Sequence, residues 1–403
     1  MASLFKNLKG DKAIWVFIGI LALISFMPIY SASSNLAYTA HGSSTFSYMS
    51  KHFIHIILGL LIMFFVHKIP YNYFRGLSML GMIGVAILLV FTLATGTTIQ
   101  GANASRWIKL PFVGLSFQPS ALPAGIVYVY TAHYLAKYRG QVQKFTHSLL
   151  RLWIPVGLIV GLILPANFST AALIFMMVMM LSFIGGYPKR YLAAILGVGF
   201  LFLGLFILTA KALPNLIPNR VDTWIKRIDN FATGGETSDD TYQVELARQA
   251  IASGKLTGMG PGKSVQKNFL PQSSSDFIFA IIIEELGLLG ATGIMIIYLV
   301  LLFRIVVIAQ KSDSLFGTLV VIGVGFPIIT QALINMAVAV QILPVTGQTL
   351  PFLSSGGSSI WMICLAFGII LSVSANRQEE KENTESIDSE NEINPLEVLS
   401  ETI

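Results

Sequence analysis

The sequence predicts an all-α integral membrane protein, built as a bundle of about ten transmembrane helices. Its 403 residues are 54% hydrophobic and only 11% charged, and the mean hydropathy is +0.72. Both values lie far outside the range of soluble globular proteins. The apolar residues also form continuous runs near the roughly 20 residues that cross a bilayer as a helix. Spanning strands would give short alternating segments instead, so helices are indicated.

Ten apolar runs predict ten spans, and the first is not a cleavable signal peptide, because it is long and further spans follow at once. The predicted spans cover residues 12–33, 52–69, 76–96, 117–136, 151–165, 169–186, 191–210, 276–303, 315–341 and 358–376. The fifth and sixth are short and are joined by only four residues. The sequence leaves open whether these two cross separately or form a broken, re-entrant pair.

Lysine and arginine residues predict the orientation of the bundle. An even number of spans puts both termini on one side of the membrane. The ends and loops assigned to the cytoplasm hold fifteen lysines and arginines, whereas the short outer loops hold only Lys51, Arg106 and Lys109. The positive-inside rule therefore predicts cytoplasmic termini and an extracytoplasmic loop over residues 211–275, whose own charges are not counted because long loops translocate largely regardless of charge.

The outer loop and the C-terminal tail have distinct patterns. Residues 220–228 have the amphipathic spacing of a helix that lies along a membrane surface, and residues 242–253 predict a second helix that ends at Gly254. Residues 1–376 form the predicted membrane domain. Nine of the 20 acidic residues fall in the last 26 positions, so residues 377–403 are predicted to be a disordered cytoplasmic tail with a solubilising role. The single cysteine, Cys364, excludes an intrachain disulfide.

Three carboxylates stand out before the tail, because Asp276, Glu284 and Glu285 lie inside a predicted span or at its outer mouth. An ionisable group at membrane depth is costly and suggests a functional site, although a structural partner for a buried cation is an equal alternative. In a regular helix from Asp276 onward, Glu284 lies about 80° around the axis and Glu285 nearly opposite. Both cannot line one site with Asp276, so we expect at least one of them to be structural.

Two polar segments add candidate ligands near the outer face. Residues 258–264 resemble a phosphate-binding P-loop, but the spacing is one residue short and no strand precedes it, which argues against a nucleotide. Lys263, with Lys255 and Lys267, could still hold a lipid diphosphate. Residues 344–359 are rich in proline, glycine and hydroxyl groups yet too apolar for a solvated loop. They predict a segment that folds back into the bundle and binds oxyanions or sugar hydroxyls, with a tight structural turn as the alternative.

A third segment contains Arg106 and Trp107, and Gln118 and Ser120 follow at the mouth of the fourth span. Arginine suits bidentate phosphate recognition, and tryptophan suits a membrane interface. Interfacial anchoring alone explains this group equally well.

Taken together in their order along the chain, these motifs resemble the SEDS family, the shape, elongation, division and sporulation proteins. The matching motifs are Arg106-Trp107, Phe117-Gln-Pro-Ser120, Tyr242-Gln243, Ala250-Ile-Ala-Ser-Gly254, Asp276-Phe-Ile-Phe-Ala280, Glu284-Glu285-Leu-Gly287 and Pro344-Val-Thr-Gly through Ser359. The resemblance covers about residues 12–376, and the ordered set is highly specific. The form of the last motif is closer to the FtsW branch of the Bacteroidetes type than to the RodA branch, which suggests a role in cell division.

The resemblance implies a ten-helix peptidoglycan glycosyltransferase of the cytoplasmic membrane, which polymerises lipid II together with a class B penicillin-binding protein. It implies that Asp276 is the catalytic base and that a divalent cation, Mg²⁺ or Mn²⁺, assists, with no organic cofactor and no nucleic acid. A lipid II flippase and a non-catalytic scaffold of the division complex are the alternatives.

We assign substrate binding to Arg106, Trp107, Gln118, Ser120, Lys263, Ser275, Thr346, Ser354 and Ser355, and structural roles to Glu284, Glu285 and Asn335. Five positions depart from the usual family pattern, in which glutamate, lysine, aspartate, glutamate and histidine occur. They are Ala121, Ala124, Asn167, Gln272 and Ser274. A substrate or metal role that depends on those side chains is not carried over to this chain.

Overall fold

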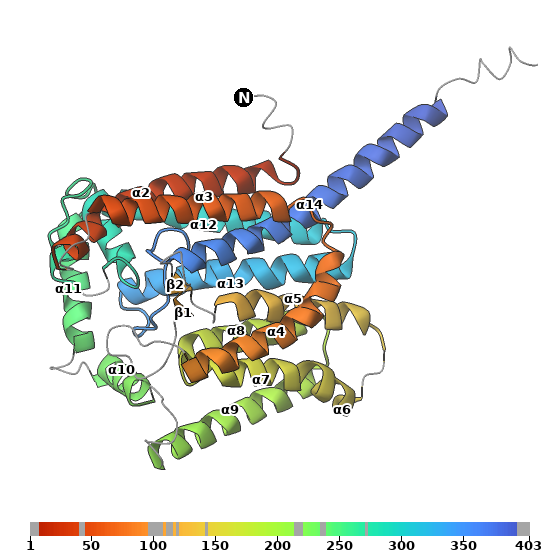
Figure 1. Cartoon of the computed structure of the whole chain (residues 1–403), viewed down its shortest axis with the longest axis horizontal. Helices are drawn as coiled ribbons and strands as arrows, with labels where there is room; N and C mark the ends of the chain where they lie inside the picture. The colour runs from red at the N-terminus through yellow and green to blue at the C-terminus, as the bar shows by residue number, and fades with distance from the viewer. Residues whose placement is uncertain are drawn as a thin grey trace, which may run out of the picture.

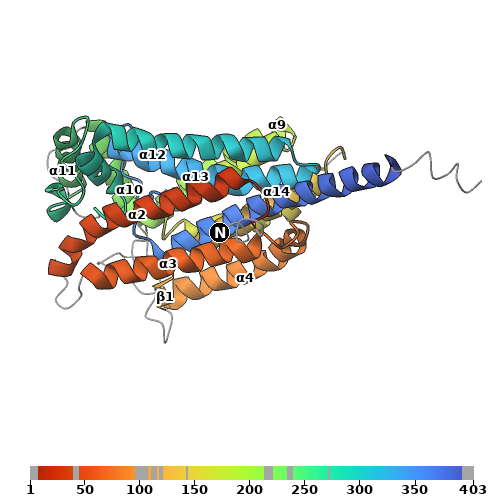
Figure 2. The same cartoon turned by 90° about the horizontal axis from the view of Figure 1, so that it is seen from above.

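The computed structural model describes residues 8–39, 45–95, 108–109, 116–117, 121–141, 144–212, 221–233, 239–270 and 273–392. Long helices run roughly side by side to form a bundle (Figures 1 and 2). The helices of the bundle are α2 (Lys12–Thr39), α3 (Thr45–Val66), α4 (Tyr73–Thr95), α5 (Ala121–Lys137), α7 (Ile154–Ile163), α8 (Phe168–Ile184), α9 (Lys189–Ala212), α12 (Ile278–Gln310), α13 (Leu315–Ala339) and α14 (Gly357–Glu392).

Each of the ten predicted spans lies on one of these helices. Among the described residues, eight helical stretches are long and apolar enough to cross a membrane, and the 17-residue helices α5 and α8 complete the set. The fifth span is longer than predicted, because α6 (Phe145–Ser148) and the π-helical turn η1 (Leu149–Trp153) lead directly into α7. The fifth and sixth spans are therefore separate helices, and α7 packs against α8.

The fourth span begins later than predicted, at Ala121 instead of residue 117. Phe117 belongs to a two-residue strand, β2 (Ser116–Phe117), which pairs antiparallel with β1 (Ile108–Lys109). The predicted site residues on either side of this small ladder lie outside the described residues. They are Arg106, Trp107, Gln118 and Ser120.

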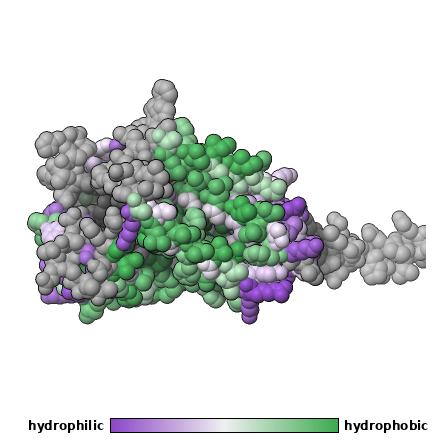
Figure 3. All heavy atoms as spheres, turned by 90° about the horizontal axis from the view of Figure 1, so that it is seen from below, coloured by the Kyte–Doolittle hydropathy of each residue, from purple (hydrophilic) through white to green (hydrophobic). Residues whose placement is uncertain are grey.

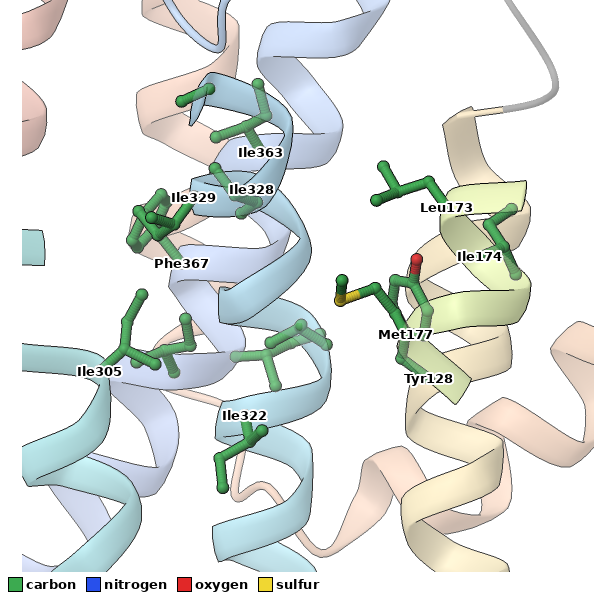
Figure 4. Packing of buried hydrophobic residues seen from close by; sticks show 14 of the residues in the cluster. Tyr128, Leu173, Ile174, Met177, Ile305, Ile322, Ile328, Ile329, Ile363 and Phe367 are labelled. Carbon is green, nitrogen blue, oxygen red and sulfur yellow. The ribbon is translucent and has the colours of Figure 1, made fainter. Parts of the chain in front are cut away.

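Helix α13 lies at the centre of the bundle, where it packs against α5, α8, α12 and α14. Figure 4 shows its isoleucines between α12 and α14 on one side and α5 and α8 on the other. Small residues allow this close approach, as is usual between helices in membranes. A Cβ on Gly325 of α13 would lie 2.8 Å from Cγ2 of Ile305 on α12. By contrast, α9 is at the edge of the bundle and is mostly exposed.

Apolar side chains cover the middle of the face seen in Figure 3, and hydrophilic residues lie toward its two ends. Leu80 on α4 and Phe200 on α9 are 71% and 67% exposed. An apolar surface this extensive marks contact with lipid or with another protein and not with water. The chain is thus a multi-pass membrane protein.

The two ends of the bundle differ. Asp11 caps α2 by accepting a hydrogen bond from the backbone N–H of Ala13 (3.0 Å) and forms an ion pair with Arg304 near the end of α12. Gly10 lies against the Leu371 carbonyl of α14, so the start of α2 and the last turns of the α14 span lie at the same end. The opposite end holds α10 (Val221–Thr233) and α11 (Asp239–Gly254), the two helices predicted for the long loop (Figure 1).

Helix α14 extends well beyond the bundle, to Glu392, where the sequence had predicted disorder from residue 377. Residues 378–392 contain neither glycine nor proline and are rich in glutamate. Extending a formed helix needs no new nucleus, and the glutamate, glutamine and lysine residues of this stretch have favourable helix propensity. The span thus supplies the nucleus that the tail lacks by itself.

Candidate functional site

Asp276 lies in a turn at the end of the bundle that carries α10 and α11. Residues 273–277 form the turn, and α12 begins only at Ile278. The Asp276 side chain is half-buried. A Cβ placed on Gly347, in the segment between α13 and α14, would lie 3.5 Å from Asp276 Oδ2. The carboxylate therefore faces the segment that the sequence predicted to fold back into the bundle.

The side chain of Asn335 ties these two segments together. Asn335 is 1% exposed on α13, and its Nδ2 donates to the backbone carbonyl of Asp276 (2.8 Å) and to that of Gln348 (2.7 Å). One amide group thus uses both N–H bonds to fix the backbone at the carboxylate and beside Gly347.

The segment from residue 340 to residue 356 is non-helical, and its later part, residues 348–354, is largely enclosed by the bundle. Leu350, Phe352 and Leu353 are at most 2% exposed, and the Tyr298 hydroxyl of α12 donates to the Pro351 carbonyl. Non-helical backbone at membrane depth is tolerated only inside protein or beside water. The segment therefore folds back into the bundle, in agreement with the prediction.

Serines join the folded-back segment to the Asp276 turn. The Ser354 hydroxyl donates to the Ser275 carbonyl (2.7 Å) and accepts from the Leu350 N–H (2.7 Å). The Ser355 N–H donates to the Ser274 carbonyl (2.8 Å). The structure thus uses the Ser354 hydroxyl within the fold, whereas the Ser355 side chain is exposed. The histidine that is usual at position 274 is not needed for this contact, because the backbone makes it.

On the other side, the folded-back segment contacts α8. Gln348 Nε2 donates to the Thr170 hydroxyl (3.2 Å), and Asn167 Oδ1 accepts from the Thr170 N–H (3.2 Å) as the N-cap of α8. Asparagine and aspartate are both strong N-caps. The change from the aspartate usual in the resembling family therefore preserves the local structure but removes a charge.

Thr346, which the sequence assigned to substrate binding, lies next to Gly347. Its Oγ1 is buried and has no hydrogen-bond partner in the part of the chain that the structure describes. A buried hydroxyl without a partner costs about 1–3 kcal/mol, and such groups call for an explanation.

Arg227, on α10, was not singled out from the sequence. Its Nη1 donates to the Val345 carbonyl (3.3 Å) and would lie 3.9 Å from a Cβ on Gly347. The structure therefore brings a guanidinium and the Asp276 carboxylate to the same glycine. The available signal was an arginine within the amphipathic segment 220–228, but the charges of this loop were left out of the orientation argument and nothing else in the sequence distinguished Arg227 from them.

The described residues offer no ready-made metal site. No group of three or more His, Cys, Asp or Glu side chains among them lies close enough together to hold a metal ion. Among the residues that the structure describes, the site around Asp276 brings together its carboxylate, the Arg227 guanidinium, hydroxyls and backbone groups.

Comparison with known proteins identifies the family. A family model described as "Cell cycle protein", which covers FtsW, RodA and SpoVE, matches residues 11–379. The chain belongs to this family. It is the SEDS family that the motifs predicted.

Relatives and solved structures agree with this membership. The chain is 32% identical to the probable peptidoglycan glycosyltransferase FtsW of Coxiella burnetii, with 89% of this chain and 95% of the relative covered. It is 32% identical to the stage V sporulation protein E of Bacillus subtilis, with 92% and 98% covered.

The crystal structure of the rod shape determining protein RodA of Thermus thermophilus matches with a TM-score of 0.64 at 22% identity, covering 91% and 97% of the two chains. A chain from a peptidoglycan synthase complex, described as coordinating polymerization and crosslinking, matches with a TM-score of 0.69 at 24% identity, covering 91% and 98%. These two structures share the fold of this chain.

Both glutamates of the SEDS motif Glu284-Glu285-Leu-Gly287 are buried and anchor the turn that follows α11. Glu284 accepts from the N–H groups of Val265 (2.9 Å) and Gln266 (3.3 Å) and from the Ser264 hydroxyl. Glu285 accepts from the Ser264 N–H (3.3 Å) and from the Ser31 hydroxyl of α2. Hydrogen bonds to a charged acceptor are about twice as strong as neutral ones.

The helix does not run regularly from Asp276, as the sequence argument had assumed. Helix α12 breaks at Gly287, whose φ is 69° and ψ is −176°. In a continuous helix, the N–H groups of residues 288 and 289 would bond to the carbonyls of Glu284 and Glu285. Instead, those carbonyls accept from the N–H groups of Met259 (2.9 Å) and Gly260 (3.0 Å).

The freed N–H groups of Leu288 and Leu289 in turn donate to the carbonyls of Lys255 (3.0 Å) and Leu256 (3.1 Å). The glycine-rich turn after α11 thus replaces two hydrogen bonds of α12. Its backbone passes so close that a Cβ on Gly258 would overlap the Glu285 carbonyl. Gly258, one of the glycines that resembled a P-loop, is therefore required by this backbone contact.

The lysines predicted to hold a diphosphate lie in the same turn. Lys267 Nζ donates to the Gly262 carbonyl (2.8 Å) and to the Ser31 hydroxyl (3.2 Å), so it helps to close the turn. The Lys263 side chain is exposed and lies over Gly260.

We predict that Glu284→Gln loosens this turn. The amide would point an NH₂ group at backbone donors, and losing a charge-assisted bond is worth about 1.5–3 kcal/mol. Hydrogen exchange at the amides of residues 264–266 should accelerate at least about tenfold. The matched control is Glu245→Gln, because Glu245 is half exposed and pairs with Arg248 at 3.6 Å on the surface of α11. Unchanged exchange in Glu284→Gln would contradict the anchoring role.

Proposed function

We propose that this SEDS protein is a peptidoglycan glycosyltransferase, which polymerises lipid II into glycan strands at the outer face of the bacterial cytoplasmic membrane. The observation that carries the proposal is the half-buried Asp276 carboxylate, whose backbone Asn335 fixes at one end of the bundle. The relatives that are named probable peptidoglycan glycosyltransferases support it. The FtsW-like form of the last motif favours a role in septal synthesis.

In this reaction, Asp276 acts as the general base. It accepts the proton of the acceptor hydroxyl while the hydroxyl oxygen bonds to the anomeric carbon of a lipid-linked donor. The bond between that carbon and the diphosphate oxygen breaks, and undecaprenyl diphosphate leaves with the electron pair. A general base within hydrogen-bond reach of the hydroxyl raises the reaction rate about 10²–10⁴-fold. Holding the carboxylate in position limits the loss of rate that misplacement would cause.

The leaving diphosphate also needs positive charge, from the protein or from a cation bound to its oxygens. A divalent cation, Mg²⁺ or Mn²⁺, stays a prediction. The described residues do not form a three-ligand set for it, so no step here depends on a metal.

We predict that Asp276→Asn lowers polymerisation by at least about a hundredfold, near the low end for losing a general base. The amide keeps the size of the side chain but cannot take the proton. The assay mixes purified protein with lipid II and follows glycan strands on a gel. The melting temperature should remain close to wild type, because Asn335 binds the backbone at this position and not the carboxylate.

The same assay separates the alternatives. A flippase would move lipid II but make no glycan in either form, and a scaffold would tolerate the change in cells. Glycan synthesis by Asp276→Asn at a near wild-type rate would contradict the assignment of the base.

The class B penicillin-binding partner is a proposal from the family resemblance. One matching structure comes from a peptidoglycan synthase complex, which supports a partner of this kind. Adding the candidate transpeptidase of the same cell should raise the polymerisation rate. Full activity of the isolated protein would show that the partner is not an activator.

We also propose that both termini are cytoplasmic and that residues 211–275 face outward, from the fifteen-to-three bias of lysine and arginine. Cysteines introduced at Thr237 and at Ser386 should react differently with an impermeant reagent in intact cells. The native Cys364 is buried and should give little background. Labelling of Ser386→Cys without lysis would refute this topology.

A further inference from the structure

Arg227 and Asp276 approach the same small space from different parts of the chain. Arg227 comes from α10 and Asp276 from the turn before α12, and both reach Gly347 of the folded-back segment. Gly347 has a φ of +69°, which side chains other than glycine rarely adopt. A Cβ at this position would lie 3.5 Å from Asp276 Oδ2 and 3.9 Å from Arg227 Nη1. Glycine therefore allows this backbone conformation and adds no side chain beside the two charged groups.

Helix α10 has the form of a helix that lies in the membrane interface. Ile228 and Phe231 on it are 59% and 50% exposed, so it presents apolar side chains to its surroundings, as amphipathic interfacial helices do. Trp224 anchors it to the bundle by ring contacts with Phe168 of α8 (centroids 4.7 Å apart) and Phe206 of α9 (6.2 Å apart). The headgroup of a membrane lipid lies at the same depth as such a helix.

The guanidinium is suited to a phosphate at this place. It has five N–H donors in a fixed fork, which bind phosphate oxygens in pairs. The bond to the Val345 carbonyl uses Nη1 and orients the fork beside Gly347. The buried Thr346 hydroxyl is next in sequence to that glycine.

We propose that Arg227 binds the diphosphate of the lipid-linked donor beside Gly347, which the Asp276 carboxylate also approaches. This inference rests on the proposed glycosyl transfer, which requires positive charge at the leaving group. It assigns the two charged groups to opposite roles: Asp276 takes the proton of the acceptor hydroxyl, and Arg227 stabilises the charge that develops on the departing diphosphate. Lys263 and Lys267 belong to the turn anchored by Glu284 and Glu285.

The test measures binding of undecaprenyl diphosphate, which carries no sugar, to purified full-length protein by native mass spectrometry. Arg227→Gln should weaken this binding about 10- to 100-fold, the range expected for losing charge-assisted bonds. Arg227→Lys keeps the charge but loses the fork, so the loss should be smaller. Undecaprenyl monophosphate should bind more weakly to the wild type, and the substitution should change its affinity less.

Arg248→Gln is the matched control. Arg248 is another arginine of the outer loop, and it also contacts the folded-back segment, through Gln341 Oε1 (3.0 Å). Its loss should leave diphosphate affinity unchanged. Unchanged affinity in Arg227→Gln, or an equal fall in Arg248→Gln, would overturn the proposal.

Further measurements distinguish a failure of the Arg227 site from a failure of folding or of the proposed glycosyl transfer. The melting temperature of each variant reports folding, and Arg227→Lys supplies a second test if the glutamine variant does not fold. If Arg227→Lys binds the diphosphate as tightly as wild type, fork recognition is wrong. A wild-type protein that binds the diphosphate through Arg227 but makes no glycan would contradict the proposed function and leave the diphosphate site intact.

Discussion

The paired hydrogen bonds of Asn335 are the interaction on which the site depends. The central helix α13 is held by packing on four sides, so a side chain on it is a fixed reference point within the bundle. From there one amide reaches the carbonyls of Asp276 and Gln348. Two segments that are far apart in the sequence thereby become parts of one site, and the serine bonds between Ser354, Ser355 and the Asp276 turn strengthen the connection.

A second constraint acts at the same end of the bundle and concerns the backbone of α12. The break in α12 at Gly287 would leave two carbonyls and two N–H groups without helical partners, at a high cost inside a membrane protein. The turn after α11 supplies all four partners, and the Glu284 and Glu285 carboxylates fix its continuation. The outer loop is thus bonded to the bundle through backbone groups, which explains why glycines are needed there.

Much of the fold could be predicted from the sequence, because apolar runs of membrane length leave few alternatives to a helix. The two loop helices and the folded-back segment followed from local patterns as well. The break at Gly287 could not be predicted, since its hydrogen-bond partners lie about 30 residues away and only tertiary contact reveals them. Asp276 stood out as a rare carboxylate. Its neighbour Arg227 did not, because the role of Arg227 depends on which segment α10 packs against, and the sequence does not reveal that contact. The helix beyond residue 377 was missed because the prediction of disorder considered the composition of the tail and not the preceding span, which nucleates the helix.

The most direct test of the central role of Asn335 is the turnover of lipid II by Asn335→Ala. The change removes both hydrogen bonds while leaving Asp276 in place, and a misplacement of about 1 Å can cost about a hundredfold in rate. We expect turnover to fall at least about tenfold in a folded protein. The control is Gln331→Ala, one turn earlier on α13, whose Nε2 donates to the Thr349 carbonyl (2.9 Å) of the same folded-back segment, and which should lose much less. Wild-type turnover in Asn335→Ala would show that the carboxylate is positioned by other contacts.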